Sequence, residues 1–344
     1  MATPFLRTAL RGFATGILVS ACLGFSIDAA TGQGRPIVIK MATLVPTGSD
    51  FHERLKEMGA QWEEASGGRV TLTIFTGGSG GEEDDILRRM RLGSLHAGAL
   101  SLAGLQGITP AVTVLAIPMA MEDRGSLARV LEAMRPKIEA EFLERGYVVL
   151  HWADAGWMRF FLPEGDPSPA AVRNFKYPQW GEDDTNDLWR EAGFPPGVVL
   201  NIADVMVGLH TGLIDAINTT PFVVASYQWF PKVPYMIDIP WAPLMGATVV
   251  DRRTWERIPD DLRPELERIA EETGDSIQAS ITRLEAEAIE AMKARGLTVV
   301  EPPLEIREEW RALFRSAYHM LRGEIIPEEW FDEALRAAGA GGGG

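Results

Sequence analysis

Apolar and polar residues follow two different periods along the first part of the chain. Residues 37–43 and 70–75 are rich in apolar and β-branched side chains, which is typical of β-strands. Between them, apolar residues recur at three- and four-residue spacing and so fall on one face of a helix. Asp50 and Glu53 can form a capping box at the start of that helix. We therefore expect a strand, a helix and a second strand in this order.

The second half of the chain shows the same alternation of strand and helix patterns. Residues 147–154, 157–162 and 246–251 predict three separate strands. A long helical pattern runs from about Asp261 to Arg295. At 1.5 Å per residue this helix would be about 50 Å long, which is longer than a typical single domain is wide. Strands that alternate with helices favour a mainly parallel α/β sheet, and a helix of this length can brace two domains at once.

The length and the lack of linkers bear on the domain organisation. The chain has 344 residues, 46% of them hydrophobic and 24% charged, which is enough for two domains of ordinary size. No linker rich in Pro, Ser or Gly divides it before the C-terminal glycine run, so two α/β units that exchange elements fit best. The expected division is domain I from residues 36–155 and 244–280, domain II from residues 156–243 and 281–320, and a C-terminal helix with a disordered glycine tail in residues 321–344.

The N-terminus has the features of an export signal. Arg7 and Arg11 precede an apolar segment that is too short to span a bilayer comfortably. Residues 1–30 are therefore interpreted as a signal peptide, with a buried N-terminal helix as the alternative. Cys22, the only cysteine, follows small residues at the end of that segment, as in a bacterial lipoprotein signal. Lipidation of Cys22 would tether the mature chain to a membrane, whereas in an ordinary signal peptide Cys22 would be incidental.

Charge and motif spacing argue against several classes of protein. The formal net charge is -15 and no basic run is present, so nucleic acid is not an expected partner. The glycine-rich residues 77–81 lack the Lys-Ser/Thr of a phosphate-binding loop and are followed by four acidic residues. The five histidines show no metal-ligand spacing, and no Gly-x-Ser-x-Gly elbow occurs. We expect no enzyme activity, no cofactor and no metal site.

Aromatic residues are concentrated between positions 150 and 245. Most single aromatic side chains pack in a core, but so many in one region favour the apolar walls of a ligand cleft. Residues 172–180, Val-Arg-Asn-Phe-Lys-Tyr-Pro-Gln-Trp, alternate as in a strand up to Pro178 and are expected to form part of such a wall. The concentration includes Trp152, Trp157, Phe160, Phe161, Phe175, Tyr177, Trp180, Trp189, Tyr227, Trp229, Phe230, Tyr235 and Trp241.

The order of several short motifs resembles that in the extracytoplasmic substrate-binding subunits of TRAP transporters, the dicarboxylate-binding type. The motifs are Ser-Gly-Gly-Arg-Val at 66–70, Arg-x-Gly-Ser-Leu at 91–95, LHTGLIDAINTTP at 209–221 and WERIPDDLRPELERIAEE at 255–272. Each is weak alone, and their collinear order over roughly residues 37 to 320 carries the resemblance. It implies a two-domain, periplasmic-binding-protein-like α/β fold, with mixed sheets flanked by helices and a long helix bracing both domains. It also implies a bacterial periplasmic receptor that closes around a small molecule and delivers it to a TRAP-type membrane permease.

One position departs from the family's pattern. In the family, the strand that corresponds to residues 172–178 carries an arginine that clamps the substrate carboxylate. Pro178 stands at that place here, and proline donates no hydrogen bond. Lys176 cannot copy the bidentate geometry of a guanidinium group. The usual organic-acid ligand is therefore in doubt.

Two kinds of ligand remain open. Arg159 lies near a second arginine that some acid-binding members use, with an offset of one residue, and could hold an organic acid. Alternatively the site is mainly apolar and takes a neutral or lipid-like ligand, which we favour because an unpaired anion in a low-dielectric cleft costs several kcal/mol. The expected ligand-binding residues are Trp157, Arg159, Tyr177, Pro178, Trp180, Asn218, Thr220 and Trp241.

Two other functions are compatible with such a fold. An enzyme acting on a carboxylate substrate would need a positioned nucleophile or an acid–base pair, and the sequence shows neither. A sensory or scaffold lipoprotein would pass the ligand state to a partner protein. The sequence alone does not separate this last function from a transport receptor.

Overall fold

The computed structural model describes residues 35–179 and 186–339, which belong to one compact unit that begins at Arg35. The predicted signal peptide with Cys22, the predicted site residue Trp180 and the last residues of the glycine tail lie outside the described residues. Within the described ranges, no helix is both long enough and apolar enough to cross a membrane.

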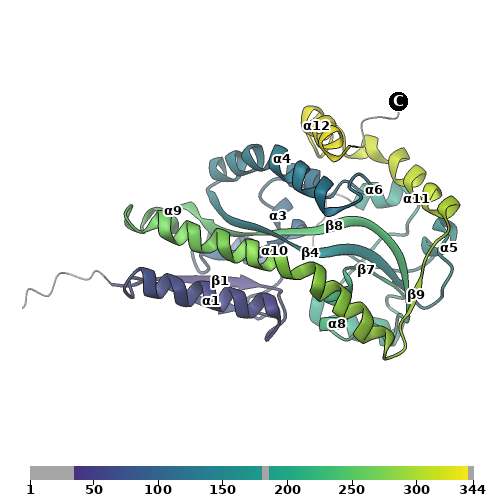
Figure 1. Cartoon of the computed structure of the whole chain (residues 1–344), viewed down its shortest axis with the longest axis horizontal. Coiled ribbons are helices and arrows are strands. Elements are labelled where there is room, and N and C mark those ends of the chain that lie inside the picture. Colours follow the sequence, from purple (N-terminus) through teal and green to yellow (C-terminus); the bar gives the residue numbers. More distant parts are fainter. Residues whose placement is uncertain (1–34, 180–185, 340–344) are drawn as a thin grey trace, which may run out of the picture. The chain divides into compact units, whose positions relative to one another are not determined.

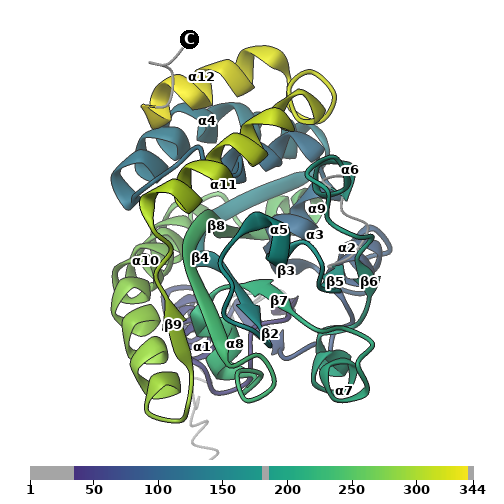
Figure 2. The same cartoon turned by 90° about the vertical axis from the view of Figure 1, so that its right-hand side faces the viewer.

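A mixed sheet forms the centre of the unit (Figures 1 and 2). Its strand order is β2-β1-β3-β8-β4-β7, and β9 pairs with β8. The pairs β1/β2, β1/β3 and β8/β9 are parallel, whereas β3/β8, β4/β8 and β4/β7 are antiparallel. The sequence-based expectation of a mainly parallel sheet is therefore wrong, because β8 returns from late in the chain and runs antiparallel between β3 and β4. The strands are β1 (Ile37–Thr43), β2 (Val70–Phe75), β3 (Ala97–Ser101), β4 (Tyr147–Leu162), β7 (Ile217–Thr219), β8 (Tyr235–Asp251) and β9 (Thr298–Val300).

The two longest strands, β4 and β8, pair over nearly their whole length. β4 has 16 residues and β8 has 17, so the strands predicted at 147–154 and 157–162 are one strand. Three register shifts interrupt the pairing, between Val149 and His151, Asp154 and Trp157, and Met158 and Phe160. The middle shift contains Gly156 at a φ of 95°, a conformation that residues with a side chain rarely adopt. Such irregularities bend a strand and turn its side chains to new directions.

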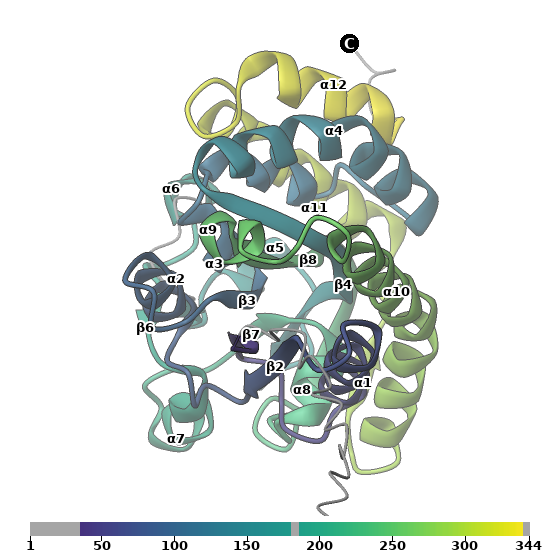
Figure 3. The same ribbon diagram turned by 90° about the vertical axis from the view of Figure 1, so that its left-hand side faces the viewer.

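Helices cover the sheet, and the long predicted helix is present. The helix α10 (Arg263–Lys293) packs against α1, α8 (Pro221–Ser226) and β4, so it contacts elements from distant parts of the chain (Figures 1 and 3). The other helices are α1 (Asp50–Ala65), α2 (Glu83–Arg91), α3 (Leu102–Gln106), α4 (Arg124–Glu144), α5 (Pro169–Val172), α6 (Asn186–Glu191), α7 (Val205–Thr211), α9 (Arg252–Glu256), α11 (Leu304–Ser316) and α12 (Glu328–Ala338), with short 3-10 helices η1 (Pro110–Ala116), η2 (Ile202–Asp204) and η3 (Tyr318–Met320).

The start of α1 differs by one residue from the prediction. Ser49, with an extended backbone, is the N-cap, and its hydroxyl accepts a hydrogen bond from the backbone N–H of His52 at 3.3 Å. Asp50 is the first helical residue and pairs with Arg54 one turn later at 2.9 Å. A capping side chain must precede the helical backbone, so Ser49 takes the role that the pattern gave to Asp50.

Candidate ligand-binding site

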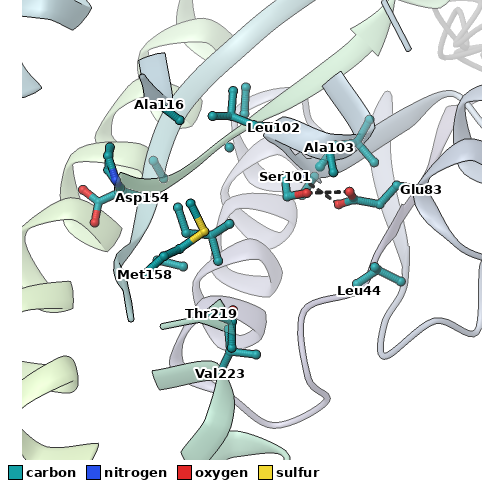
Figure 4. A pocket seen from close by; sticks show the side chains of 18 of the residues that line it. Leu44, Glu83, Ser101, Leu102, Ala103, Ala116, Asp154, Met158, Thr219 and Val223 are labelled. Atoms are coloured by element: carbon teal, nitrogen blue, oxygen red, sulfur yellow. Dashed lines mark hydrogen bonds between the residues drawn. The ribbon is translucent and has the colours of Figure 1, made fainter. Parts of the chain in front are cut away.

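A cavity of about 290 Å³ lies along the central strands (Figure 4). Its walls come from the segment after β1, from α1, α2, β3, α3 and η1, and from β4, α6, β7, α8, β8 and α10. These elements include both of the domains predicted from the sequence. The boundaries of those domains stay a prediction.

The cavity lies along β4 and β8. Its lining runs from His151 to Met158 on β4 and from Trp241 to Thr248 on β8. Because the strands are antiparallel, His151 lies opposite Thr248 at one end, and Met158 lies opposite Ala242 at the other. At a rise of 3.3 Å per residue, eight strand residues span at most about 23 Å.

Apolar side chains form most of the walls. The aromatic rings of Phe51, Trp189, Phe222, Tyr227 and Trp241 line the cavity. Trp189 and Trp241 meet edge to face with ring centroids 4.9 Å apart, and Phe51 and Phe222 lie 5.6 Å apart. Aromatic pairs of this kind form rigid apolar walls.

The charged groups of the cavity are acidic. Glu83 and Asp154 line it, and none of its described lining residues is a lysine or an arginine. Asp154 is buried and pairs with Arg124 at 2.9 Å. It also accepts hydrogen bonds from the Gly156 backbone N–H at 2.9 Å and from Gln278. In Figure 4 the Asp154 carboxylate points away from Met158. Because this carboxylate is already paired with Arg124, Asp154 is a structural acid.

The Glu83 carboxylate occupies the backbone donors at the start of α3. It accepts from the Ser101 backbone N–H at 2.6 Å, the Ser101 hydroxyl at 2.6 Å and the Gly104 backbone N–H at 2.9 Å (Figure 4). Burial raises the pKa of Glu83, while the hydrogen bonds from Ser101 and Gly104 act in the opposite direction. The chain thus fills this anion-binding position with its own carboxylate, so these donors are not free for a ligand anion.

Four lining residues carry buried polar atoms without a hydrogen-bond partner. They are both ring nitrogens of His151, Oδ1 of Asn218, Nε1 of Trp241 and Oγ1 of Thr248, and the statement covers partners in residues 35–179 and 186–339. The large majority of buried side-chain polar atoms in proteins have a partner in the protein or in ordered water, so four such residues around one cavity mark places where water or a ligand would bind. Burial lowers the pKa of His151 to about 4, which makes the imidazole neutral near pH 7.

Two of the residues predicted from the sequence, Asn218 and Trp241, line this cavity. Thr220 does not; it is buried beside Thr219 and caps α8 by accepting from the Val223 backbone N–H at 3.4 Å. Trp157 is buried in the core and does not line the cavity either. The ligand-binding roles of all these residues stay predictions.

Arg159 lies away from the cavity. It donates to Asp238 at 2.8 Å, to the carboxylate of Glu285 on α10 and to the Trp157 carbonyl at 3.1 Å. Its neighbour Met158 lines the cavity instead, because successive side chains of a strand point to opposite faces. The structure therefore corrects the expected placement of Arg159, which is committed to two carboxylates on the other side of β4.

Residues 172–179, the described part of the stretch 172–180, do not form the predicted strand. Val172 ends α5, and only Pro178 and Gln179 form a short strand, β5, which pairs with β6 (Val198–Val199). Tyr177 donates its hydroxyl to the Val172 carbonyl at 2.9 Å, and burial raises its pKa well above the usual value. The helix α5 occupies the start of the stretch, and the strand begins only at Pro178, where the sequence pattern placed its end. Tyr177 and Pro178 border a smaller cavity of about 190 Å³ that shares Trp189 and Asn218 with the large one.

Several residues of the cavity were not identified from the sequence. The acids of the Glu83 segment look like an ordinary solvated first turn of a helix, and His151 was considered only as a metal ligand. Thr248 carries no sequence signal. Met158 did carry a sequence signal. It comes two positions after Gly156 and next to Arg159, and neighbouring residues of a strand point to opposite faces. Among the described residues, no group of three or more His, Cys, Asp or Glu side chains is arranged to hold a metal ion.

An α/β fold around a mainly apolar cavity is consistent with a small-molecule-binding protein. Residues 41–324 match the family described as "Bacterial extracellular solute-binding protein, family 7", and the chain belongs to this family. The resemblance to TRAP-type binding subunits is thereby confirmed. The family and the structural neighbours are transport receptors, so the chain is a binding protein and not an enzyme.

Relatives and solved structures agree with this assignment. The C4-dicarboxylate-binding periplasmic protein DctP of Rhodobacter capsulatus is 23% identical over 320 residues, covering 91% of this chain and 95% of the relative. The sialic acid-binding periplasmic protein SiaP of Vibrio cholerae is 18% identical over 298 residues, covering 85% and 91%. A TRAP periplasmic solute-binding protein from Shewanella oneidensis with bound succinate has a TM-score of 0.82 at 16% identity, covering 88% of this chain and 99% of that chain. One from Pseudomonas putida F1 with bound D-glucuronate has a TM-score of 0.79 at 20% identity, covering 87% and 96%. The predicted fold class, a two-domain α/β binding-protein fold with mixed strands, is confirmed.

Proposed function

We propose that the protein is an extracytoplasmic receptor that captures an uncharged, mainly apolar small molecule in the cavity along β4 and β8 and delivers it to a TRAP-type membrane permease. Membership of the solute-binding family supports the receptor role. The observation that carries the ligand class is the electrostatics of the cavity: its described lining contains two carboxylates, a histidine that burial keeps neutral, and no lysine or arginine.

An organic acid would be poorly stabilised in this cavity. A carboxylate moved from water into a low-dielectric site loses several kcal/mol unless a cation pairs with it. Glu83 adds like-charge repulsion where it is ionised, and it already holds the donors of Ser101 and Gly104. The cavity therefore disfavours an anion, because its described lining contains carboxylates and no lysine or arginine.

The alternative ligand, an organic acid held by Arg159, has less support. The guanidinium group contacts Asp238 and Glu285, and its side chain is 13% exposed. A ligand carboxylate would have to displace both acids and approach from the face of β4 that is opposite to the cavity. Two family positions that carry arginine in acid-binding members, near Met158 and at Pro178, are apolar here.

Closure around the ligand is the proposed mode of capture. The cavity takes residues from both predicted domains, and α10 contacts elements of both. A ligand that contacts both domains stabilises the closed state, because that state has more contacts with it. Small-angle scattering should show compaction when a bound ligand is restored to the stripped protein, and an unchanged profile at saturation would contradict closure.

A lipid anchor at Cys22 is part of the proposal. The small residues before Cys22 support it, and a tether would keep the receptor near the permease. Mass spectrometry of the mature N-terminus tests it: a diacylated Cys22 is expected, and an unmodified N-terminus beyond Cys22 would remove the anchor.

Three probe molecules of similar shape and different charge test the ligand class. Octanol, octanoate and octylamine share a chain and differ in charge at neutral pH. Isothermal titration calorimetry should give the tightest binding for octanol, by at least tenfold over octanoate, which corresponds to about 1.4 kcal/mol. Tighter binding of octanoate would overturn the proposed ligand class, and tighter binding of octylamine would show that the acidic groups select a cation.

A further inference from the structure

The cavity has unpaired polar residues near both of its ends. His151 and Thr248 are direct cross-strand partners at one end, so their side chains lie on the same face of the sheet. Near the other end, Asn218 is the strand partner of Phe160, and the ring of Trp241 stacks on Phe160 with centroids 6.0 Å apart. Thr248 and Trp241 are seven residues apart on β8, so the two pairs are well separated.

Each pair offers the same hydrogen-bonding complement. A neutral imidazole has one donor and one acceptor, and a threonine hydroxyl can be either. The Trp241 indole N–H is a donor, and the Asn218 amide oxygen is an acceptor. A hydroxyl group both donates and accepts, so one ligand hydroxyl could pair with Thr248 and one ring nitrogen of His151, and another with Trp241 and Asn218.

Between the two pairs the lining of β4 and β8 is mainly apolar, and its one charged residue, Asp154, is paired with Arg124. Ala153, Ala155, Met158, Leu244 and Ala247 line the intervening parts of β4 and β8. A cavity of about 290 Å³ has the volume of roughly ten water molecules, at about 30 Å³ each. Spread along the two strands, this volume suits a narrow chain better than a compact ring.

Unpaired buried polar atoms raise the free energy of the protein, so a ligand that forms hydrogen bonds with them would gain affinity. A buried polar group without a partner carries a desolvation cost that no hydrogen bond offsets. Among the described residues, the affected side chains His151, Trp241 and Thr248 are each at most 7% exposed. These atoms are buried, so a ligand hydroxyl would reach them only when the walls move apart during binding.

We propose that the ligand is a chain-like, uncharged molecule with a hydroxyl group at each end, one held by His151 and Thr248 and the other by Asn218 and Trp241. This inference rests on the proposed receptor function and narrows its ligand to a substrate class. The apolar middle of the molecule lies against Met158 and the alanines of β4, and neither end carries a charge.

The test compares octanol with the octanediol that has a hydroxyl at each end. In calorimetric titrations, the diol should bind the wild-type protein about tenfold more tightly than octanol, because it makes a second set of hydrogen bonds. The variant Thr248→Val keeps the shape and removes one hydroxyl, and should reduce the affinity for the diol severalfold. It should leave octanol almost unchanged, since octanol then uses the end at Asn218.

Two further variants make the test decisive. Asn218→Leu removes the acceptor at the other end and should have the same selective effect, which keeps the test valid if Thr248→Val does not fold. Thr113→Val is the matched control, because Thr113 also lines the cavity but its hydroxyl already accepts from Gln106 at 3.1 Å. Its effect on the diol and on octanol should be equal.

The outcomes separate this inference from the proposed function. Equal binding of diol and octanol, or an equal loss in Thr113→Val and Thr248→Val, would overturn the two-ended ligand and leave the neutral-ligand receptor standing. Failure of both neutral probes to bind would also overturn the chain-like ligand. Preference for octanoate over both would reject the proposed ligand class itself.

Discussion

At the scale of single residues, Met158, two positions after Gly156, makes this part of the cavity lining apolar. Met158 places an apolar, polarisable thioether in the lining, while the next residue, Arg159, pairs with acids on the opposite face of β4. Two neighbouring residues of β4 thus differ in role, because Met158 faces the cavity and Arg159 forms structural ion pairs.

Replacement of Met158 by arginine should convert the selectivity of the cavity. The variant Met158→Arg introduces a cation beside the ligand, so octanoate should bind at least tenfold more tightly than it binds the wild-type protein. The control Met158→Leu conserves volume and charge and should not change octanoate binding. Calorimetry on folded protein measures both, and an unchanged affinity for octanoate in Met158→Arg would show that Met158 does not govern selectivity.

Loss of the Arg159 side chain should weaken the fold more than ligand binding. Arg159→Leu leaves Glu285, which is 10% exposed, without its cation, and breaking a buried pair costs about 3–5 kcal/mol. Urea unfolding should show this loss, and octanol affinity below the unfolding range should stay within about twofold. A variant that keeps its stability but no longer binds any probe would return Arg159 to the ligand site.

The buried imidazole of His151 should make stability depend on pH. Its pKa is lowered from 6.5 to about 4 by burial, so the unfolded chain binds a proton that the folded protein excludes. Its contribution is full above about pH 6.5 and is lost as the pH falls toward 4, by on the order of 3 kcal/mol. Glu83 lines the same cavity with a raised pKa, which acts in the opposite sense because its folded form takes up a proton first.

The difference between wild type and His151→Leu isolates this effect from that of Glu83. Urea unfolding between pH 4 and 7 should show a steeper loss of stability in the wild type as the pH falls. Parallel curves for the two proteins would contradict the buried neutral imidazole.

Residue-scale prediction from the sequence was uneven. Asn218 and Trp241 line the cavity as expected, because the family resemblance and the aromatic concentration both point to their region. Trp157, Thr220 and Arg159 do not, since the face on which a strand residue lies depends on pleating and bulges that the sequence does not display. The unpaired atoms of His151 and Thr248 depend on contacts between distant segments, so no local pattern reveals them.

At the scale of elements, periodic apolar patterns were the most reliable guide. The stripe from Leu266 to Met292 predicted α10 to within two residues at each end, because a long helix with one buried face repeats its signal many times. β4 was divided in two by its bulges, and the N-terminal half of β8 was missed because its prolines, Pro240 and Pro243, interrupt the strand pattern.

The contact between α10 and β4 gives a prediction at this scale. A side chain at Gly274 of α10 would bring its Cβ to 2.8 Å from the Cβ of His151, and neither atom can move without its backbone. Gly274→Ala should therefore destabilise the protein by about 1–3 kcal/mol through overpacking, although alanine favours a helix more than glycine does. Thermal unfolding measures the change, with Thr282→Ala on the exposed face of α10 as a neutral control. A stabilised Gly274→Ala would show that α10 does not press on His151.

At the scale of the whole molecule, the cavity collects residues from Thr43 to Leu321, far apart in the sequence. The order of weak family motifs was enough to predict the fold class and the receptor family. The ligand class was less accessible, because it depends on which charges the folded chain turns toward the cavity and which it pairs elsewhere. The boundaries between the two domains, about which hinge closure would occur, stay a prediction.

The most direct measurement is native mass spectrometry of the purified mature protein, followed by solvent extraction of the molecule that accompanies it. The account predicts a bound species that organic solvent removes and that carries hydroxyl groups and no ionised group. Its return to the stripped wild-type protein, but not to Met158→Arg, would place it in the cavity. An organic acid that binds the stripped protein and is lost from Arg159→Leu would contradict the account.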